Sequence, residues 1–328
     1  MIPVVHLHFH ARRTGVTRHV EDIVRALPAE VAGWGLPRAL PRISWPALRA
    51  RASAGPLVVH AHRNLELALA LLLRWRHPAV RVVFTRHSAG RPTAWTRWLA
   101  RRADARVVFT RGALRELGLS AEIIPHGVDV ERFSPPAERS AAWRVLGVGG
   151  ARGLGAVGRI RPEKGQEDLA RAWASLAPRH PGWRALLVGQ VSRRWRAFAR
   201  RLGKLSPLEW LDEVGEPAAV YRGLTILVQP SRRESFSLVL LEAMASGCCV
   251  VAAALPHYPE LLEHGTTGFL YPAGDVDELT GLLEPLLAHP ARAEAVGRAA
   301  RQEVQARWTL AGEVERLRAL YARMERLG

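Results

Sequence analysis

The sequence predicts an α/β protein of two doubly wound domains, each a parallel sheet covered by helices. Its 328 residues exceed what one compact core usually holds. Short runs rich in β-branched and apolar residues alternate with helical patterns, which is the order that parallel strands joined by helical crossovers produce. A stretch rich in proline and glycine, residues 133–153, interrupts this alternation and marks the junction between the domains.

Ten runs are typical of buried strands, and helical patterns fill the spaces between them. In the first half these runs span residues 4–9, 57–60, 80–85, 106–109 and 122–124. In the second half they span residues 154–157, 185–188, 224–228, 249–252 and 268–271. The final stretch has apolar residues at the spacing of one helix face, at Val314, Leu317, Leu320 and Met324.

These patterns divide the chain into four segments. We expect a first domain over residues 1–137, a linker with a short helix over 138–152, a second domain over 153–309 and a final helix over 310–328.

The composition excludes several classes of protein. Apolar residues make up 48% of the chain and charged residues 23%, which is typical of a folded globular protein and excludes bulk disorder. No apolar run approaches the roughly 20 residues that span a bilayer, and residues 1–13 lack the apolar core of a signal peptide. Cys248 and Cys249 are adjacent and too close for an ordinary disulfide. We therefore expect a cytoplasmic protein with reduced cysteines.

The net charge of +17 is concentrated in the first half of the chain. Residues 1–150 hold 23 basic and 10 acidic residues, or +13, and residues 151–328 hold 24 and 20, or +4. A basic first domain suits nucleic acid, an anionic lipid surface or a phosphorylated substrate. The sequence has no zinc-finger, basic-zipper or RRM signature, so we expect no nucleic-acid partner.

The loop after the predicted strand 154–157 carries two cations between glycines. Arg159 and Lys164 lie five residues apart, with Gly158 before them and Gly165 after them. At a strand-to-helix turn, a guanidinium and an ammonium so spaced can clamp a diphosphate. A solvated turn is the alternative that this segment alone leaves open.

The loop after the predicted strand 224–228 leads into a second helix start. Ser237 is placed to cap this helix and Gly247 to close it. A helix N-terminus favours a phosphate, and its amides come from Ser235, Phe236, Ser237 and Leu238. Glu234 on the loop and Glu242 in the second helical turn suit the sugar and the ribose of a nucleotide sugar. The alternative is that Glu242 only faces solvent.

Two groups of residues raise the question of a metal. His6, His8 and His10 alternate on one predicted strand, and His60, His62 and His87 end two others, so several histidines can meet at one rim. Asp275 and Asp277 form an Asp-x-Asp pair, although aspartate is also a common helix cap. Hydrogen-bonded or substrate-facing histidines are commoner than metal ligands, and we expect no metal.

Glu234-x7-Glu242, together with the loop from Gly158 to Gly165, resembles the donor site of the family 4 glycosyltransferases, which are retaining enzymes of GT-B fold. The resemblance extends over most of the chain, through Gly15-Val16 and the segments 58–62, 85–87 and 124–133. The segments 180–183 and 221–225 are more particularly similar to lipopolysaccharide core mannosyltransferases.

The resemblance implies two Rossmann-like domains facing a cleft, with a final helix that crosses back to the first domain. The N-terminal domain would receive the acceptor and the C-terminal domain the nucleotide sugar. Arg159 and Lys164 would neutralise the diphosphate, Glu242 would bind the ribose, and Glu234 with the amides of 235–237 would position the sugar. Gly158 and Gly15 would belong to the two glycine-rich loops, and His87 would act on the acceptor side. No cofactor or metal is implied.

The chain departs from the family pattern at three positions of interest. Thr14 precedes Gly15 where a second glycine is usual, Ser237 stands where the family commonly has glycine, and His126 stands where asparagine is usual. These departures leave the identity of the donor more open than the reaction class.

The expected reaction moves a hexose, with mannose favoured, from a nucleotide-diphosphate sugar to a cell-envelope glycolipid such as the lipopolysaccharide inner core. GDP-mannose is favoured over UDP-sugars as the donor. The basic first domain suits an anionic glycolipid acceptor and peripheral contact with an anionic inner membrane. The alternatives are a UDP-sugar used on another acceptor and an inactive GT-B module that binds a partner.

Overall fold

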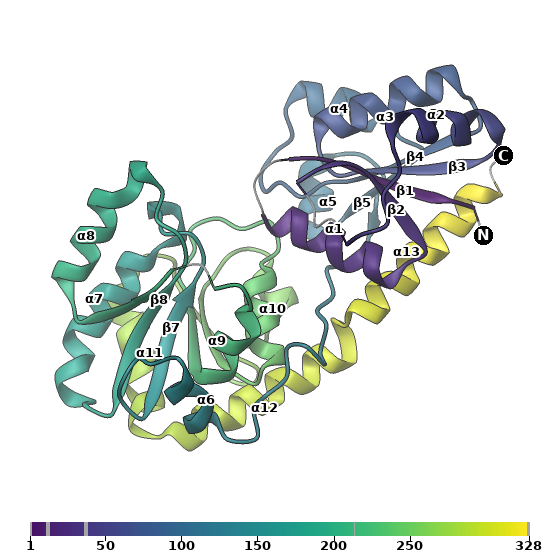
Figure 1. The fold of residues 1–328 in the computed structure, drawn as a ribbon. Helices are drawn as coiled ribbons and strands as arrows, with labels where there is room; N and C mark the ends of the chain where they lie inside the picture. The colour runs from purple at the N-terminus through teal and green to yellow at the C-terminus, as the bar shows by residue number, and fades with distance from the viewer. Residues whose placement is uncertain (1, 11–13, 36–38, 213, 327–328) are drawn as a thin grey trace. The chain divides into compact units, whose positions relative to one another are not determined.

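The computed structural model describes residues 2–10, 14–35, 39–212 and 214–326. The chain divides into two compact units (Figure 1). The first unit holds Met1–Gly127 together with Leu310–Gly328, and the second holds Val128–Thr309.

The first unit is built on a sheet of six parallel strands in the order β2-β1-β3-β4-β5-β6. The strands are β1 (Val4–Phe9), β2 (Ala29–Trp34), β3 (Leu57–Ala61), β4 (Val80–Thr85), β5 (Ala105–Val108) and β6 (Glu122–Ile123). The helices are α1 (Gly15–Ala26), α2 (Trp45–Ala54), α3 (Asn64–Arg76), α4 (Ala94–Ala100), α5 (Arg111–Leu117) and α13 (Leu310–Glu325).

Alternate residues of these strands face different helices, because successive side chains of a strand point to opposite faces. Val5, Val59 and Val82 belong to the apolar core that also contains residues of α2, α3 and α4. Val4 and Val58 belong to a second core, shared with α1 and α13. The C-terminal helix is therefore part of the packing of the first unit.

The second unit has a sheet of six parallel strands in the order β12-β11-β10-β7-β8-β9. The strands are β7 (Arg152–Val157), β8 (Trp183–Val188), β9 (Leu208–Leu211), β10 (Leu224–Gln229), β11 (Cys249–Ala253) and β12 (Phe269–Tyr271). The helices are α6 (Arg139–Val145), α7 (Gln166–Leu176), α8 (Arg196–Leu205), α9 (Pro217–Gly223), α10 (Leu238–Ala245), α11 (Val276–Ala288) and α12 (Pro290–Arg307).

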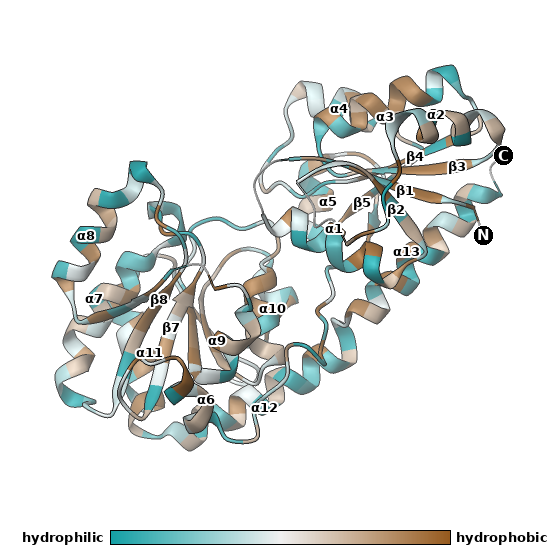
Figure 2. Ribbon diagram, in the orientation of Figure 1, coloured by the Kyte–Doolittle hydropathy of each residue, from teal (hydrophilic) through white to brown (hydrophobic). Residues whose placement is uncertain are grey.

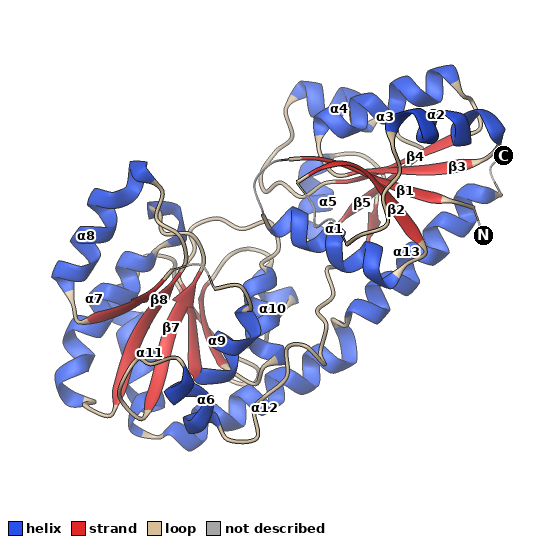
Figure 3. Cartoon of the chain, in the orientation of Figure 1, coloured by secondary structure: helices blue, strands red, loops and turns tan. Residues whose placement is uncertain are grey.

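In both units a parallel sheet lies between layers of helices, as the sequence predicts. Their strands are mostly hydrophobic (Figure 2), and helices flank each sheet on both faces (Figure 3). A parallel sheet covered on both faces needs apolar residues on both sides of its strands, which explains the near-continuous apolar runs. The predicted fold class is confirmed.

All ten predicted runs coincide with strands, but the sequence analysis missed β2 and β9. Both lie at an edge of their sheets. Strand β2 includes Glu30 and Gly33, and β9 is only four residues long with Glu209 inside it. An edge strand pairs on one side only, so its sequence carries a weaker apolar signal than a central strand.

The segment 138–152, expected to be a linker, packs into the second unit. Helix α6 lies within it, and its Trp143 is 1% exposed. The Trp143 indole N–H donates to the Gly149 carbonyl at 2.8 Å, and the ring fills the space that a Cβ on Gly153 would need. The second unit begins at Val128, and the segment 138–152 belongs to it because this tryptophan anchors α6.

Trp143→Ala should destabilise the second unit by about 3–5 kcal/mol, because it leaves a large cavity under α6. Denaturant unfolding followed by circular dichroism measures the loss. Val145→Ala on the same helix is the control, since Val145 is 85% exposed and should change stability by less than about 0.5 kcal/mol. Equal unfolding of the two variants would contradict the packing role of α6.

Candidate functional site

The two loops that carry the predicted donor residues lie beside each other in the second unit. They follow β7 and β10, which are neighbours in the sheet. Two contacts of Arg232 join the loops: its main-chain N–H donates to the Glu163 carbonyl at 2.9 Å, and its guanidinium bonds Asp168 at 2.7 Å. The carboxyl ends of parallel strands share one edge, so this arrangement follows from the strand order.

Gly165 allows the two loops to approach closely. Its φ of +66° lies in the left-handed region, and a Cβ there would sit 1.9 Å from the carbonyl oxygen of Pro230. Any other residue would strain the backbone and push the loops apart. Gly158, at the start of the first loop, also has a positive φ of +141°.

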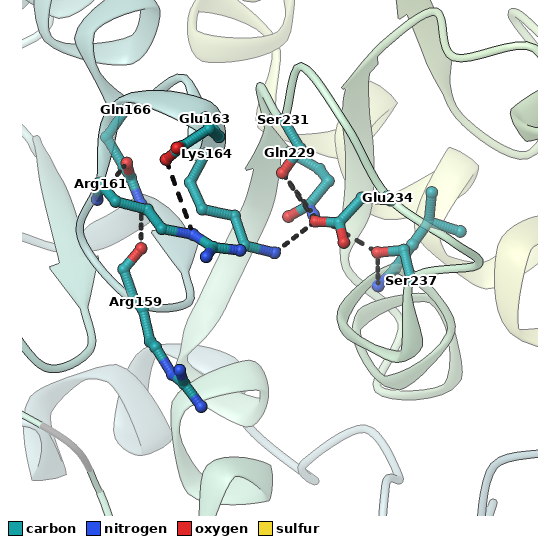
Figure 4. A network of polar contacts seen from close by, with 10 residues as sticks. Arg159, Arg161, Glu163, Lys164, Gln166, Gln229, Ser231, Glu234 and Ser237 are labelled. Atoms are coloured by element: carbon teal, nitrogen blue, oxygen red, sulfur yellow. Dashed lines mark hydrogen bonds and ion pairs between the residues drawn. The ribbon is translucent and has the colours of Figure 1, made fainter. Parts of the chain in front are cut away.

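Lys164 and Glu234 form the centre of this site. The Lys164 ammonium contacts Glu234 Oε1, and the same oxygen accepts hydrogen bonds from Ser231 Oγ at 2.8 Å and Gln229 Nε2 at 3.1 Å (Figure 4). The two charged side chains are 17% and 15% exposed. The pair is therefore fixed by its neighbours and still reachable by a ligand.

Arg159 is fixed by a contact of its main chain. Its carbonyl oxygen accepts from Gln166 Nε2 at 3.0 Å, which fixes the backbone of the loop. Its guanidinium is directed away from the Lys164–Glu234 pair (Figure 4). The structure thus brings Lys164 and Glu234 together but does not bring Arg159 to the same point, and its role in binding the diphosphate stays a prediction.

Helix α10 begins as the sequence predicts. Ser237 Oγ accepts from the main-chain N–H of Leu240 at 3.4 Å, as a helix cap does. Ser237 has a φ of +87° and is the one non-glycine residue in the described ranges with a positive φ. Glycine adopts such a conformation without strain, so Ser237 carries a backbone strain that a glycine would not.

The other residues at the start of α10 offer mainly their main chain. The side chain of Phe236 is buried, with its ring 6.3 Å from that of Trp308. Ser235 and Leu238 are half-buried, and Leu238 is the first residue of the helix. A helix N-terminus of this kind attracts an anion through its amides and its dipole.

Glu242 lies inside the second unit. It is 4% exposed, so the alternative that it faces solvent is wrong. Its Oε2 accepts a hydrogen bond from the Tyr221 hydroxyl at 2.8 Å. A buried carboxylate needs such donors, and Tyr221 therefore helps to fix the orientation of Glu242.

Sequence reasoning missed the polar residues that surround Glu234. Gln229 is the polar last residue of β10, whose other residues except Thr225 are apolar, and this was the signal that the sequence offered. Ser231 follows two residues later. Tyr258 is buried, and burial raises the pKa of its hydroxyl, with the charge of Glu234 adding to the effect. Its phenol therefore stays protonated near the carboxylate.

In the first unit, His87 follows β4 and belongs to a chain of imidazoles. His87 Nε2 lies 3.1 Å from His62 Nδ1, and His62 Nε2 lies 3.0 Å from His6 Nδ1. Burial, then the proximity of His19, lowers the pKa of His87 well below its usual value. His87 is thus a neutral imidazole near pH 7.

The expectation that histidines meet at one rim is confirmed for His6, His60, His62 and His87. His8 is held apart from them by the Trp34 carbonyl, 2.9 Å from its Nδ1.

Two other predicted features lie at helix starts. Gly15 opens α1 behind the cap residue Thr14, and a Cβ at Gly15 would meet no atom within 4 Å. Packing within the first unit therefore does not require glycine there, and its predicted contact with the donor stays a prediction. Asp275 caps α11 by accepting from the Glu278 N–H at 2.9 Å, so the capping interpretation of the Asp-x-Asp pair is confirmed.

In the part of the chain that the structure describes, no helix is both long and apolar enough to cross a bilayer.

Two family models match this chain. The model described as Glycosyltransferase Family 4 matches residues 5–132, and the model described as Glycosyl transferases group 1 matches residues 151–289. The chain belongs to glycosyltransferase family 4.

Two similar proteins align with most of this chain. The lipopolysaccharide core biosynthesis mannosyltransferase LpcC of Rhizobium leguminosarum bv. viciae is 35% identical, covering 98% of this chain and 96% of its own length. The lipopolysaccharide core biosynthesis mannosyltransferase LpsB of Rhizobium meliloti is 34% identical, covering 84% of each chain.

Solved structures share the fold. The crystal structure of Anabaena Alr3699/HepE in complex with UDP and glucose has a TM-score of 0.85 at 19% identity, covering 98% of this chain and 100% of that chain. The resemblance found in the sequence is confirmed. This family 4 protein is a glycosyltransferase of GT-B fold.

Lys164→Ala should lower kcat for glycosyl transfer by about 10²–10³-fold, because it removes the ammonium that is predicted to stabilise charge on the departing diphosphate. A nucleotide-release assay measures this. Lys204, the other lysine of the chain, is exposed on α8 and provides the matched control. An unchanged kcat in Lys164→Ala, equal to that of Lys204→Ala, would contradict the assignment.

Proposed function

We propose that this enzyme transfers mannose from GDP-mannose to an anionic glycolipid of the lipopolysaccharide core, with retention of the anomeric configuration. The observation that carries the proposal is the 35% identity to a lipopolysaccharide core mannosyltransferase over 98% of this chain. The geometry of the loops after β7 and β10 supports the chemistry.

The diphosphate of the donor binds between Lys164 and the start of α10. The ammonium contributes a positive charge, and the amides from Ser235 to Leu238 contribute the partial positive charge of a helix end. Arg159 joins the site by turning its guanidinium toward the bound diphosphate. All these groups stabilise negative charge that grows on the leaving nucleotide, so the donor itself needs no metal.

The two carboxylates bind the two sugar rings of the donor. Glu234 releases Lys164 to the diphosphate and accepts hydrogen bonds from hydroxyls of the transferred mannose. Glu242, oriented by the Tyr221 hydroxyl, accepts from the ribose. Because Glu234 binds the sugar, the chain offers no assigned nucleophile, and the acceptor attacks on the face that the leaving phosphate vacates.

His87 acts on the acceptor side. As a neutral imidazole it accepts a hydrogen bond at one nitrogen while the other is held by His62. This orientation suits a hydrogen bond with a hydroxyl near the reacting centre.

A tryptophan- and arginine-rich surface on α3 and α4 supports contact with an anionic membrane. Trp75, Trp95 and Trp98 are 75%, 54% and 45% exposed. The rings of Trp95 and Trp98 stack at 5.1 Å, and the guanidinium of Arg102 lies 3.6 Å from the Trp98 ring centre. Tryptophan prefers the membrane interface, and arginine is attracted to anionic lipid headgroups.

GDP-mannose and GDP should raise the melting temperature more than UDP-glucose, UDP-GlcNAc or UDP. A ligand at about 100 times its Kd stabilises the enzyme by about 2.7 kcal/mol. Radiolabelled mannose should then pass to a Kdo-bearing lipid acceptor. Transfer with a UDP-sugar alone would overturn the donor assignment. Binding of a donor without any transfer would favour an inactive binding module.

Reversing the charge of Arg97, Arg101 and Arg102 to glutamate should weaken sedimentation with anionic vesicles at least tenfold, since each basic residue near the surface contributes about 1 kcal/mol. The donor-induced melting shift should not change. The control reverses Arg196, Arg200 and Arg298, which are exposed arginines of the second unit. Equal vesicle binding by both triple variants would remove the membrane assignment from α3 and α4.

A further inference from the structure

Gln229 places a buried amide at the carboxyl end of a strand that is paired on both sides. It is the last residue of β10 and is 2% exposed. The register of β10 with β11 extends as far as this residue, which pairs with Ala252. Burying an amide costs free energy unless the group is hydrogen-bonded. The partners of Gln229 therefore explain why a polar residue stands there.

Those partners all belong to the loop between β10 and α10. The Gln229 Nε2 atom lies 3.1 Å from Ser231 Oγ, 3.1 Å from Glu234 Oε1 and 3.4 Å from Ser237 Oγ. A carboxylate only accepts, so the amide atom that faces Glu234 is the nitrogen. Its two N–H groups serve three acceptors, so at least one of them is shared. One buried amide thus contacts the beginning, the middle and the end of this loop.

Three donors meet at a single oxygen of Glu234. The Lys164 ammonium contacts Oε1, Ser231 Oγ donates to it at 2.8 Å, and Gln229 Nε2 donates to it at 3.1 Å. Lys164 reaches this oxygen from the loop after β7, whereas Gln229 and Ser231 belong to the end of β10 and the residues just after it. The carboxylate is therefore held from two sides, by a cation and by two neutral donors.

The neutral donors matter most when the cation leaves. The proposed function requires Lys164 to turn from Glu234 to the diphosphate of the donor. A carboxylate that is only 15% exposed then needs other donors to stay in place. Gln229 and Ser231 supply them, because their bonds to Oε1 do not involve the ammonium. A side chain fixed by a strand is suited to holding one that is carried by a loop.

We propose that Gln229, together with Ser231, is the positioning residue that holds Glu234 for the transferred sugar of the donor. The inference rests on the proposed function, and Gln229 acts through Glu234 rather than by touching the donor. The diphosphate is bound by Lys164 and the start of α10, so only the sugar depends on Glu234. Gln229 therefore contributes to the binding of the nucleotide sugar and much less to that of the bare nucleoside diphosphate.

Gln229→Met tests this selectivity, because it removes the amide and keeps the length of the side chain. It should lower the affinity for GDP-mannose about tenfold, as expected for the loss of a hydrogen bond to a charged group, and kcat/KM for the donor by a similar factor. The affinity for GDP should fall much less, since the contact with Ser237 is the longest of the three. Isothermal titration calorimetry measures both affinities. A purely structural role would weaken both ligands alike, and that result would overturn the inference.

Three further variants make the result specific. Thr225→Val is the matched control, because Thr225 is 3% exposed but lies near the other end of β10, and both affinities should be unchanged. Ser231→Ala should repeat the selective loss, and it decides the question if circular dichroism shows that Gln229→Met is not folded. Lys164→Ala should weaken GDP and GDP-mannose together, because the diphosphate is common to both.

Failure of this inference is distinguishable from failure of the proposed function. If the wild-type protein binds UDP-glucose in place of GDP-mannose, the proposed donor is wrong, and the same comparison made with UDP-glucose and UDP tests Gln229. If the wild-type protein binds no nucleotide sugar, both proposals are overturned. Equal affinity of the wild type and Gln229→Met for the nucleotide sugar would overturn the positioning role alone.

Discussion

The shared direction of the strands is the constraint on which both units depend. In a parallel sheet every connection returns the chain to the same starting edge, so all loops that follow strands emerge at the opposite edge. Strand order then decides which loops are neighbours. In the second unit β7 and β10 are adjacent, and this adjacency brings Lys164 to Glu234 across 70 residues of sequence. In the first unit β1, β3 and β4 are adjacent, and their ends bring His6, His62 and His87 together.

Each unit contains a buried carboxylate that is oriented by hydrogen-bond donors. Glu242 accepts from the Tyr221 hydroxyl, and Glu313 accepts from the main-chain N–H of Gly127 at 2.8 Å as well as from His19. Burial by itself would raise the pKa of Glu313, but His19, which is hydrogen-bonded to it, and the nearby His126 hold it below its usual range. Glu313, supplied with donors in this way, stays ionised inside the protein.

The departures from the family pattern have structural consequences. Ser237 takes a left-handed conformation that glycine adopts without strain, and in exchange its hydroxyl caps α10. His126 in place of asparagine adds an imidazole that stacks on Phe109 with ring centres 3.7 Å apart and lies beside His19. Ser237 thus changes the start of α10, and His126 enlarges the histidine cluster of the first unit.

The sequence by itself determined the two parallel sheets, ten of their strands, the capping of α10 and the loops that carry Lys164, Glu234 and Glu242. These features follow from local signals: apolar runs, helix caps and glycines at turns. Tertiary structure alone decided the edge strands β2 and β9, the inclusion of Trp143 in the second unit, the direction of the Arg159 side chain and the meeting of His19 with His87, His126 and Glu313. The physical reason is that these features depend on contacts between segments far apart in the chain. Local composition records whether a residue is buried, but not which residue lies beside it.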